Sequence, residues 1–287
     1  KGKKKKIDEF RNHYLRLTRR YDENNIGDAQ NEADVFITGS DQVWNYLIVN
    51  KDGTYYLDFV KQKKTCSYAA SFGVASIPME YQKFYREKLF NINYISVREN
   101  NGTEIVKDMT GHNAAVMPDP TLLLSRKVWD GLSVAPNIKG KYILVYKITK
   151  ADELLDFSKK LSEKTGLPIV YIPNDLKSGS IGKLKTNVGP EEWLGYIKNA
   201  EYVVTNSFHG TVFSILFNKK FFSEVSAKVN PSTSRLKSLL RMFDLENRTI
   251  EQFTEEMITE ELNSEIINNI LVSQRNKAQN FFKEVFL

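Results

Sequence analysis

Short apolar runs alternate with helical patterns along most of this 287-residue chain, and this alternation limits the possible folds more than any other feature. The runs are too short to cross a bilayer, and the segments between them repeat apolar residues at the spacing of one helix face. Strands that are buried on both faces have continuous apolar runs, which is typical of parallel sheets covered by helices. The sequence therefore predicts an α/β fold with parallel sheets.

The predicted elements form two successive βα series. In the first series, strands are predicted at 34–38, 64–70, 94–97 and 115–117, and helices at 10–20, 79–90 and 100–109. In the second series, strands are predicted at 141–148, 168–172, 202–205 and 220–223, and helices at 151–164, 190–199, 210–217 and 235–242. The chain from 251 onward is predicted to be helical throughout.

A linker-like stretch separates the two series. Residues 133–140 contain proline, asparagine and glycine, which is typical of a domain boundary. A chain of 287 residues also exceeds what one hydrophobic core usually organises. We therefore expect two similar domains that face each other, residues 1–135 and residues 136–287, and leave open whether the last helix packs back on the first domain.

The net charge of the chain is concentrated at its start. The chain has 41 basic and 35 acidic residues, a formal charge of +6, and the lysines at 1 and 3–6 supply most of that excess. The rest of the chain is nearly neutral, so its basic isoelectric point does not indicate a nucleic-acid partner. The lysine run is predicted to be a solvated stretch, with surface contact to an anionic membrane or glycan as the alternative.

Residue counts exclude several classes of site. The single cysteine, Cys66, allows neither an internal disulfide nor a thiolate metal cluster, and the three histidines lie far apart in the sequence. The sequence contains no glycine-rich dinucleotide loop, Walker A loop, Gly-x-Ser-x-Gly elbow or His-Glu-x-x-His motif. It therefore favours a protein of a reducing compartment, without a metal site and without a transmembrane segment.

Polar residues with catalytic potential gather where predicted strands end. Ligands of open α/β sheets bind at the carboxyl ends of the strands, where helix N-termini present amide groups to anions. Four strand ends carry such residues, at 39–45, 98–99, 119–121 and 207–210. We therefore expect the functional site among these four segments.

His209 and Arg98 are the two strongest candidates. His209 lies between a strand and a helix, next to Gly210, which lets a ligand approach the backbone, so its imidazole could act as an acid or a base near neutral pH. The alternative is a buried histidine that is hydrogen-bonded to backbone. The guanidinium of Arg98 suits a carboxylate or a phosphate, or else forms a surface ion pair with Glu99.

Three further candidates each have a structural alternative. Asp41 either acts in a site or only caps a helix, and Asp119 either lines a site or only starts an Asp-Pro turn. Trp44 either faces a ligand or packs in a core. These residues alone do not decide between the two interpretations.

Taken together, the strand ends resemble the signature blocks of the polysaccharide pyruvyl transferase family. The blocks occur in the family's usual order, at 37–45 (ITGSDQVWN), 67–73 (SYAASFG), 95–99 (ISVRE), 119–121 (DPT) and 205–211 (TNSFHGT). Five blocks in order are specific, and the resemblance covers roughly residues 10 to 248.

The resemblance implies a fold similar to GT-B glycosyltransferases, with two Rossmann-like domains facing across a cleft. It also implies transfer of the pyruvyl group of phosphoenolpyruvate to two hydroxyls of a sugar in a polysaccharide or lipid-linked glycan, which forms a cyclic ketal and releases phosphate. Phosphoenolpyruvate is then a co-substrate, and no further cofactor, metal or nucleic acid is expected. The alternatives are a GT-B glycosyltransferase that uses a nucleotide sugar and a non-catalytic glycan-binding relative. We expect a cytoplasmic protein, with peripheral contact at the inner face of the membrane left open.

The family pattern assigns roles to the candidate residues. It makes His209 the acid or a donor to the phosphate, and it makes Arg98 a ligand of the donor's anionic groups. Asp41 is a second catalytic candidate. Asp41, Trp44 and Asp119 are further assigned to acceptor binding or to shaping the cleft, so the first domain, residues 1–135, is expected to be the acceptor side.

Two departures from the family pattern bear on the site. Some members carry an arginine where this chain has Ser207, which we keep as a donor-binding candidate, so a second cation must come from elsewhere. Arg235, Lys228 and Lys219 are the candidates, and we prefer Arg235 because it opens a predicted helix. Members also usually begin with a strand and an Asn-Tyr-Gly-type loop that are not found here, so we expect the first domain to lack its first strand.

Overall fold

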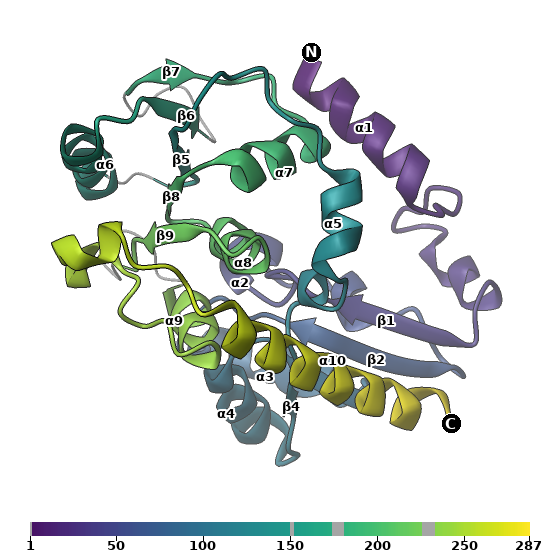
Figure 1. Cartoon of the computed structure of the whole chain (residues 1–287). Helices are drawn as coiled ribbons and strands as arrows, with labels where there is room; N and C mark the ends of the chain where they lie inside the picture. The colour runs from purple at the N-terminus through teal and green to yellow at the C-terminus, as the bar shows by residue number, and fades with distance from the viewer. Residues whose placement is uncertain (1, 150–151, 174–180, 226–232) are drawn as a thin grey trace. The chain divides into compact units, whose positions relative to one another are not determined.

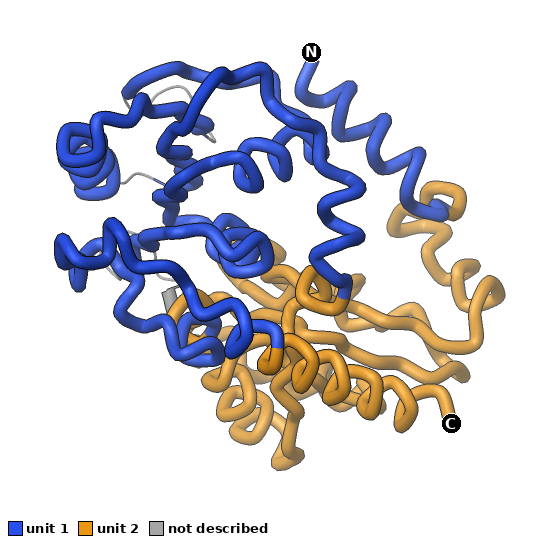
Figure 2. Tube along the Cα trace, in the orientation of Figure 1, with its two compact units in different colours: residues 1–17, 124–230, 239–268 blue, residues 18–123, 231–238, 269–287 orange. Residues whose placement is uncertain are grey.

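A computed structural model describes residues 2–149, 152–173, 181–225 and 233–287 of the chain (Figure 1). The chain forms two compact units, which are described separately below and coloured in Figure 2. Unit 1 comprises Lys1–Leu17, Leu124–Asn230 and Leu239–Asn268, and unit 2 comprises Thr18–Leu123, Pro231–Ser238 and Asn269–Leu287. The division near residue 124 lies before the expected boundary at residue 135, and the first residues belong with the second βα series.

Unit 2 contains a four-stranded parallel sheet in the order β1-β2-β3-β4. Its strands are β1 (Val35–Gly39), β2 (Lys64–Ala70), β3 (Tyr94–Val97) and β4 (Ala115–Val116). Its helices are α2 (Tyr46–Val49), α3 (Met79–Leu89), α4 (Asn100–Thr110) and the C-terminal part of α10 (Ser264–Phe286), with short 3-10 segments at Ile26–Asn31, Thr54–Tyr56 and Pro120–Leu122. The strands therefore follow one another across the sheet in chain order.

Both faces of the unit 2 sheet are covered by apolar side chains. One core contains Phe72 and Val97 together with residues of α3 and α4. On the other face, Cys66 and Tyr68 of β2 pack against Phe281 of α10. This two-sided burial explains why the strands appear as continuous apolar runs in the sequence.

Unit 1 contains a five-stranded parallel sheet in the order β7-β6-β5-β8-β9. Its strands are β5 (Ile143–Lys147), β6 (Ile169–Pro173), β7 (Lys183–Leu184), β8 (Tyr202–Thr205) and β9 (Lys220–Ser223). Its helices are α1 (Gly2–Tyr14), α5 (Arg126–Leu132), α6 (Asp152–Thr165), α7 (Pro190–Asn199) and α8 (Phe208–Leu216), and it shares α9 (Thr233–Met242) with unit 2. The chain adds β6 on one side of β5 and β8 on the other, so the strand order reverses between β5 and β8.

The core of unit 1 lies between the sheet and α6. Val145, Val204 and Phe222 of the sheet pack against Leu154 and Leu161 of α6. Figure 1 shows α7 and α8 on the opposite side of this sheet. The parallel α/β fold that the sequence predicts is thus present in each unit, and the predicted bounds of α7, β8 and β9 are confirmed.

The N-terminal lysines were expected to be a solvated stretch, and Lys3, Lys4 and Lys5 are exposed as expected, although they lie in a helix, α1. This helix has no buried residue, and it is held by ionic and polar contacts to α7. Lys6 Nζ lies 2.6 Å from Glu192 Oε1, and the Tyr14 hydroxyl donates a hydrogen bond of 2.9 Å to Glu191. Helix α1 therefore belongs to unit 1, and it begins and ends earlier than the predicted helix at 10–20.

The prediction of continuous helix after residue 251 is also wrong. Two short 3-10 helices, Ile250–Gln252 and Glu255–Ile258, precede α10. The side chain of Asn263 accepts hydrogen bonds from the backbone of Glu265 and Ile266, which is the N-cap arrangement that starts a helix. Among the described helices, none combines the length and the apolar character that crossing a membrane requires.

Candidate active site

A cluster of charged side chains lies at the carboxyl ends of β1, β3 and β4 in unit 2. Asp41 follows β1, Arg98 follows β3, and Asp119 follows β4. Arg98 Nη1 lies 2.8 Å from Asp119 Oδ2, and Arg98 Nη2 lies 3.5 Å from Asp41 Oδ1. Three of the four strand-end segments singled out in the sequence therefore meet at one edge of this sheet.

Arg235, from the first turns of α9, completes the unit 2 cluster. Its Nη1 lies 3.6 Å from the same Asp41 Oδ1 that Arg98 approaches. Burial, and then the nearby charge of Arg98, lower the pKa of Arg235 to about 10, so the side chain stays cationic at neutral pH. Two buried guanidinium groups thus share one carboxylate at long distances, and the side chain of that carboxylate is 68% exposed.

Asp119 holds Arg98 in place. Its Oδ2 accepts a hydrogen bond of 2.8 Å from the Ser40 hydroxyl as well as the one from Arg98, and its Oδ1 accepts from the backbone and hydroxyl of Thr121. The Asp119 and Arg98 side chains are each only 2% exposed. The Asp-Pro turn expected for Asp119 is present as the N-cap of Pro120–Leu122, and the same side chain serves both purposes.

Glu99 is buried beneath the cluster and does not form a surface ion pair with Arg98. Its Oε1 accepts hydrogen bonds from the Ser71 hydroxyl and from the backbone of Phe72 and Gly73. A charged group without exposure needs such donors. The surface-pair alternative for Arg98 and Glu99 is therefore wrong.

Trp44 is a core residue. It has no exposed surface, its ring stacks on Tyr56 with centroids 5.6 Å apart, and its Nε1 donates a hydrogen bond to the Tyr55 carbonyl. A side chain that is fully enclosed offers no face to a sugar. The assignment of Trp44 to acceptor binding is therefore wrong, and its contribution is to shape the unit 2 core.

In unit 1, the segment after β8 positions His209. Ser207 is the N-cap of α8, where its hydroxyl accepts a hydrogen bond of 3.2 Å from the backbone of Gly210. Ser207 also forms a hydrogen bond with Tyr146 of β5, which lowers the pKa of that phenol, although burial raises it by more. His209 lies in the first turn of α8 and is partly exposed.

Gly210 allows close packing between the start of α8 and the end of β8. A Cβ at this position would lie 2.5 Å from Thr205 Oγ1, so only glycine lets α8 begin this close to the end of β8. The close approach involves the chain's own strand. Packing within unit 1 therefore explains why this position is a glycine. That Gly210 also makes room for a ligand stays a prediction.

A pocket of about 290 Å³ opens beside His209 within unit 1. Three aromatic residues, Tyr146, Trp193 and Phe213, form much of its lining. The ring of Trp193 lies edge-on to the rings of the other two, with centroids 5.3 Å apart in each case. The pocket is therefore walled by packed aromatic rings and is largely apolar.

Glu224 is a buried carboxyl group at the carboxyl end of β9. Its Oε2 accepts a hydrogen bond of 3.3 Å from Asn206, and its Oε1 is buried without a hydrogen-bond partner among the described residues. Burial raises the pKa of Glu224 to about 7, with smaller contributions from the charges of Glu251 and Glu153. This side chain is therefore close to half protonated at neutral pH.

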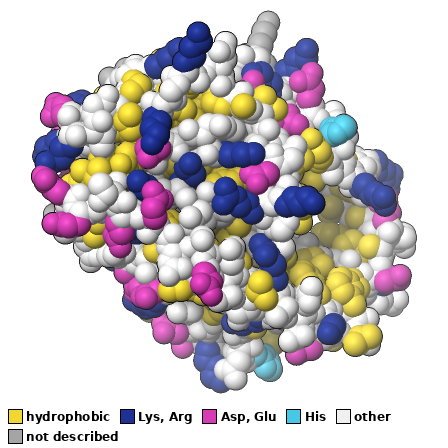
Figure 3. Space-filling view, viewed as in Figure 1, with side chains coloured by type: hydrophobic (Ala, Val, Ile, Leu, Met, Phe, Trp, Pro, Cys, Tyr) yellow, Lys and Arg dark blue, Asp and Glu magenta, His cyan; other side chains and the backbone are white. Residues whose placement is uncertain are grey.

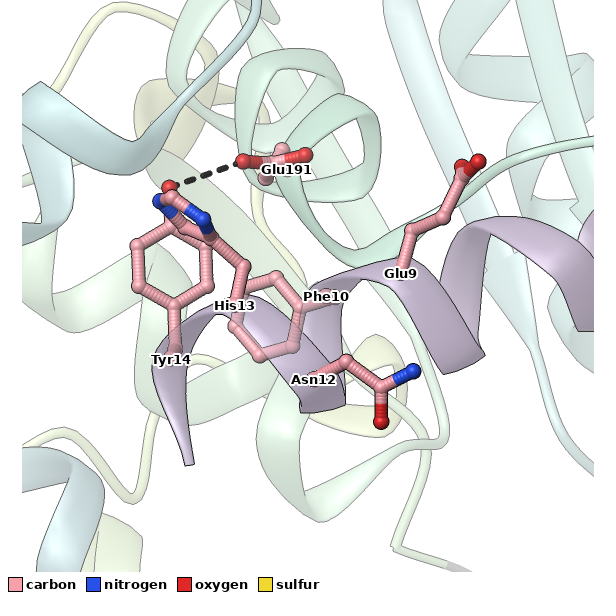
Figure 4. Close-up of a pocket in the computed structure, with 6 residues that line it drawn as sticks. All are labelled: Glu9, Phe10, Asn12, His13, Tyr14 and Glu191. Carbon is pink, nitrogen blue, oxygen red and sulfur yellow. Dashed lines mark hydrogen bonds between the residues drawn. The ribbon is translucent and has the colours of Figure 1, made fainter. Parts of the chain in front are cut away.

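A second cavity in unit 1, of about 590 Å³, runs along the end of α1 (Figure 4). Glu9, His13 and Tyr14 line it together with Glu191 of α7, and the dashed line marks the hydrogen bond from Tyr14 to Glu191. That hydrogen bond raises the pKa of Tyr14. Within the described ranges, no three histidine, cysteine, aspartate or glutamate side chains are grouped as a metal site.

The model of the polysaccharide pyruvyl transferase family matches residues 1–223. The chain belongs to this family. Membership indicates a transferase, with pyruvyl transfer to a polysaccharide as its activity. No curated protein matches the chain.

Three solved structures are similar to this pyruvyl transferase family member. AviGT4, a glycosyltransferase involved in avilamycin A biosynthesis, is 10% identical with a TM-score of 0.51, over 94% of this chain and 79% of that chain. A putative UDP-N-acetylglucosamine 2-epimerase from Listeria monocytogenes is 9% identical with a TM-score of 0.45, over 90% of this chain and 77% of that chain. UDP-GlcNAc 2-epimerase from Methanocaldococcus jannaschii, in complex with UDP-GlcNAc and UDP, is 12% identical with a TM-score of 0.40, over 94% of this chain and 80% of that chain. At this identity the likeness to AviGT4 shows the fold alone, and it confirms the expected Rossmann-like, GT-B-like fold class.

Lys219 and Lys228 were the alternatives to Arg235 as a second cation, and the structure describes only Lys219. Lys219 precedes β9, at the end of the strand opposite to the carboxyl end, and its ammonium donates a hydrogen bond to the Lys198 carbonyl. Burial lowers the pKa of Lys219. Lys228 lies outside the described residues. Arg235 is thus the one of these candidates that the described structure places beside Arg98.

Sequence reasoning did not find the structural roles of three groups at the strand ends. Ser40 and Glu99 support the unit 2 cluster, and each adjoins a residue that was singled out. Glu224 directly follows a correctly predicted strand, so its position was a usable signal. Its burial and its raised pKa depend on packing that the sequence does not display.

Proposed function

We propose that the chain transfers the pyruvyl group of phosphoenolpyruvate to two hydroxyls of a sugar, in a polysaccharide or lipid-linked glycan, to form a cyclic ketal and release phosphate. One observation carries this proposal: Arg98 and Arg235 converge on a single exposed carboxylate at the carboxyl edge of the unit 2 sheet. Guanidinium groups are well suited to carboxylates and phosphates, and phosphoenolpyruvate has both.

The reaction needs an acid, a base and cations. A proton added to the methylene carbon of phosphoenolpyruvate creates a cationic centre at the carbon that carries the phosphate. A sugar hydroxyl attacks that carbon and loses its proton, the carbon–oxygen bond to phosphate breaks, and a second hydroxyl closes the ring and loses its proton. One proton is consumed and two are released, so the net proton leaves with phosphate or to solvent.

In this scheme, the donor replaces Asp41 between the arginines. The distances of 3.5 and 3.6 Å are long for charge-assisted hydrogen bonds, and the exposed Asp41 side chain can move away into solvent. Once displaced, its carboxylate can accept a proton from a sugar hydroxyl. His209 is the proposed acid, in keeping with the family pattern, and Ser207 supports the helix that carries it.

The direct test incubates the protein with phosphoenolpyruvate and a candidate glycan, free or lipid-linked. Phosphate should be released, and the glycan should gain the mass of one pyruvyl group. Phosphoenolpyruvate alone should raise the melting temperature, because a ligand that binds only the folded state stabilises it. No shift with phosphoenolpyruvate, together with a shift caused by a UDP- or GDP-sugar, would instead indicate a glycosyltransferase.

Two variants test the arginine pair. Arg98→Lys and Arg235→Lys keep the charge but lose the planar fork, so each should raise the KM for phosphoenolpyruvate about tenfold or more, equivalent to at least about 1.4 kcal/mol. Arg241→Lys is the matched control on the same helix as Arg235, because its side chain is 71% exposed and pairs with Glu246. An unchanged KM in both variants would remove the arginines from donor binding.

A third variant tests the acid. His209→Asn should reduce kcat by about 100-fold or more, which is the usual contribution of a general acid, while the melting temperature stays near that of the parent protein. Activity that survives this substitution would reject His209 as the proton donor.

A further inference from the structure

The topology of unit 1 places a ligand crevice next to His209. In open parallel sheets, ligands bind outside the carboxyl ends of the two strands between which the strand order reverses. Here the order reverses between β5 and β8. The aromatic pocket lies at that point, since Tyr146 near the end of β5 and His209 after β8 both line it.

The pocket has the wrong electrostatic character for phosphoenolpyruvate. Among the described residues, its lining contains no carboxylate and no arginine, and the cationic or basic members are Lys3, which is exposed, and His209, which is partly exposed. Transfer of a trianion from water into a largely apolar site is costly without several paired cations. The described arginines that approach one another, Arg98 and Arg235, lie in unit 2 instead.

The pocket suits a neutral ring with polar edges. Aromatic rings offer flat apolar faces on which the C–H face of a pyranose can pack, and a few polar groups at the rim can orient its hydroxyls. Tyr146, Trp193 and Phe213 supply the faces, while Thr186 and His209 supply polar atoms at the lining. The volume of about 290 Å³ is at the lower end of small-molecule pockets, which favours a single sugar ring over a whole nucleotide sugar.

We infer that this pocket is the acceptor subsite and holds one sugar ring of the glycan, with His209 beside the hydroxyls of that ring. This inference rests on the proposed function, and it divides the two substrates by charge: the anionic donor binds the arginines of unit 2, and the neutral acceptor ring binds the aromatic pocket of unit 1. It also replaces the expectation that Trp44 binds the acceptor, because Trp193 lines this cavity whereas Trp44 is fully enclosed.

The test measures sugar binding without any reaction. The full chain is titrated with methyl glycosides of glucose, galactose, mannose, N-acetylglucosamine and N-acetylmannosamine, followed by tryptophan fluorescence and by saturation-transfer NMR. At least one glycoside should bind. Trp193→Ala should weaken that binding about tenfold or more, as expected when an aromatic stacking surface is removed.

Trp129→Phe is the matched control. Trp129 contacts the Phe213 ring at 4.9 Å and does not line the pocket. This variant should bind the glycoside as the parent protein does, and Trp193→Phe should bind it with little loss while its fluorescence response changes. Circular dichroism and the melting temperature show whether each variant is folded, and the conservative Trp193→Phe keeps the test valid if Trp193→Ala unfolds.

The thermal shift caused by phosphoenolpyruvate shows whether a negative result contradicts this inference or the proposed function. This shift should be the same in Trp193→Ala and in the parent protein. If phosphoenolpyruvate stabilises the parent and no glycoside binds, the pocket assignment is wrong and the proposed function stands. If a glycoside binds through Trp193 and phosphoenolpyruvate gives no shift, the pocket assignment stands and the donor assignment is wrong. Binding of UDP that depends on Trp193 and displaces the glycoside would make the pocket a nucleotide site and overturn the inference.

Discussion

The carboxyl edges of the two sheets have the same parallel architecture and opposite chemistry. In unit 2 the edge carries buried ions that are paired with one another, foremost Arg98 with Asp119. In unit 1 the edge carries aromatic rings, His209, and a buried carboxyl group, Glu224, whose raised pKa keeps it partly neutral. A buried ion requires a partner or a proton, and the two edges use these two different solutions. The two sheets thus place strand ends in the same way, and the side chains at those ends give the two edges their different charge.

The largest effect is expected from breaking the buried pair in unit 2. Asp119→Ala removes the carboxylate that holds Arg98 at 2.8 Å and leaves the buried guanidinium without its close ion-pair partner, so the free energy of unfolding should fall by about 3 kcal/mol or more. Urea unfolding measures this loss. Trp44 is the tryptophan of unit 2, so its fluorescence, in a background with Trp129→Phe and Trp193→Phe, reports on that unit.

A solvent-exposed pair in the same unit provides the control for Asp119→Ala. Asp34 lies 2.8 Å from Lys63, and its side chain is 93% exposed. Its pKa is lowered by a hydrogen bond from Lys63, yet Asp34→Ala should leave stability almost unchanged because water screens the pair. Equal losses for the two variants would show that burial is not what makes the Arg98 pair important.

A smaller and pH-dependent effect is expected at the unit 1 edge. Burial raises the pKa of Glu224 to about 7, so between its usual value near 4.5 and pH 7 the unfolded chain releases this proton before the folded chain does. Stability should therefore fall as pH rises through that window, by up to about 3 kcal/mol in total, and stay lower above it. Glu224→Gln removes this titration. The variant should therefore be more stable than the parent protein at pH 8 and about equally stable near pH 4.

The measurement for Glu224 is the melting temperature as a function of pH. Glu163→Gln, an exposed position on α6, is the matched control and should follow the parent protein at each pH. If the difference between Glu224→Gln and the parent did not change with pH, the pKa of Glu224 would be the same in the folded and the unfolded state, and burial would not raise it.

The same contrast shows what a sequence can and cannot predict here. Apolar runs gave the strands of both units, and the rule that ligands bind at strand ends led to Asp41, Arg98 and Asp119 before their contacts were known. The approach of Arg235 to Arg98 depends on a helix far away in the chain, and no local pattern encodes its direction. The pKa of Glu224 and the enclosure of Trp44 arise from packing of several elements, so neither could be predicted from the residues around them.

The bounds of helix α1 were mispredicted for a related reason. A run of lysines has little local tendency to bury anything, and the described helix indeed buries nothing. Its place in unit 1 depends on two acidic residues of α7, Glu191 and Glu192, that lie far away in the sequence. A pattern of charges predicts a solvated segment, and only the tertiary partner shows where that segment is held.

The smallest effect is expected from the ion pair that joins α1 to α7 near the aromatic pocket. Lys6 and Glu192 are each about one-third exposed, and Glu192 also accepts a hydrogen bond from the backbone of Gly189 at the start of α7. Lys6→Met should therefore lower the free energy of unfolding by less than about 1 kcal/mol, and the loss should shrink further in high salt, since screening weakens exposed pairs. Lys5→Met, on the same helix turn but paired only with Glu9 at the surface, should cause no measurable loss. Urea unfolding at low and high salt measures both variants. A salt-independent loss as large as that of Asp119→Ala would mean that the Lys6 pair behaves as a buried one, and unit 1 would then depend on a buried ion pair as unit 2 does.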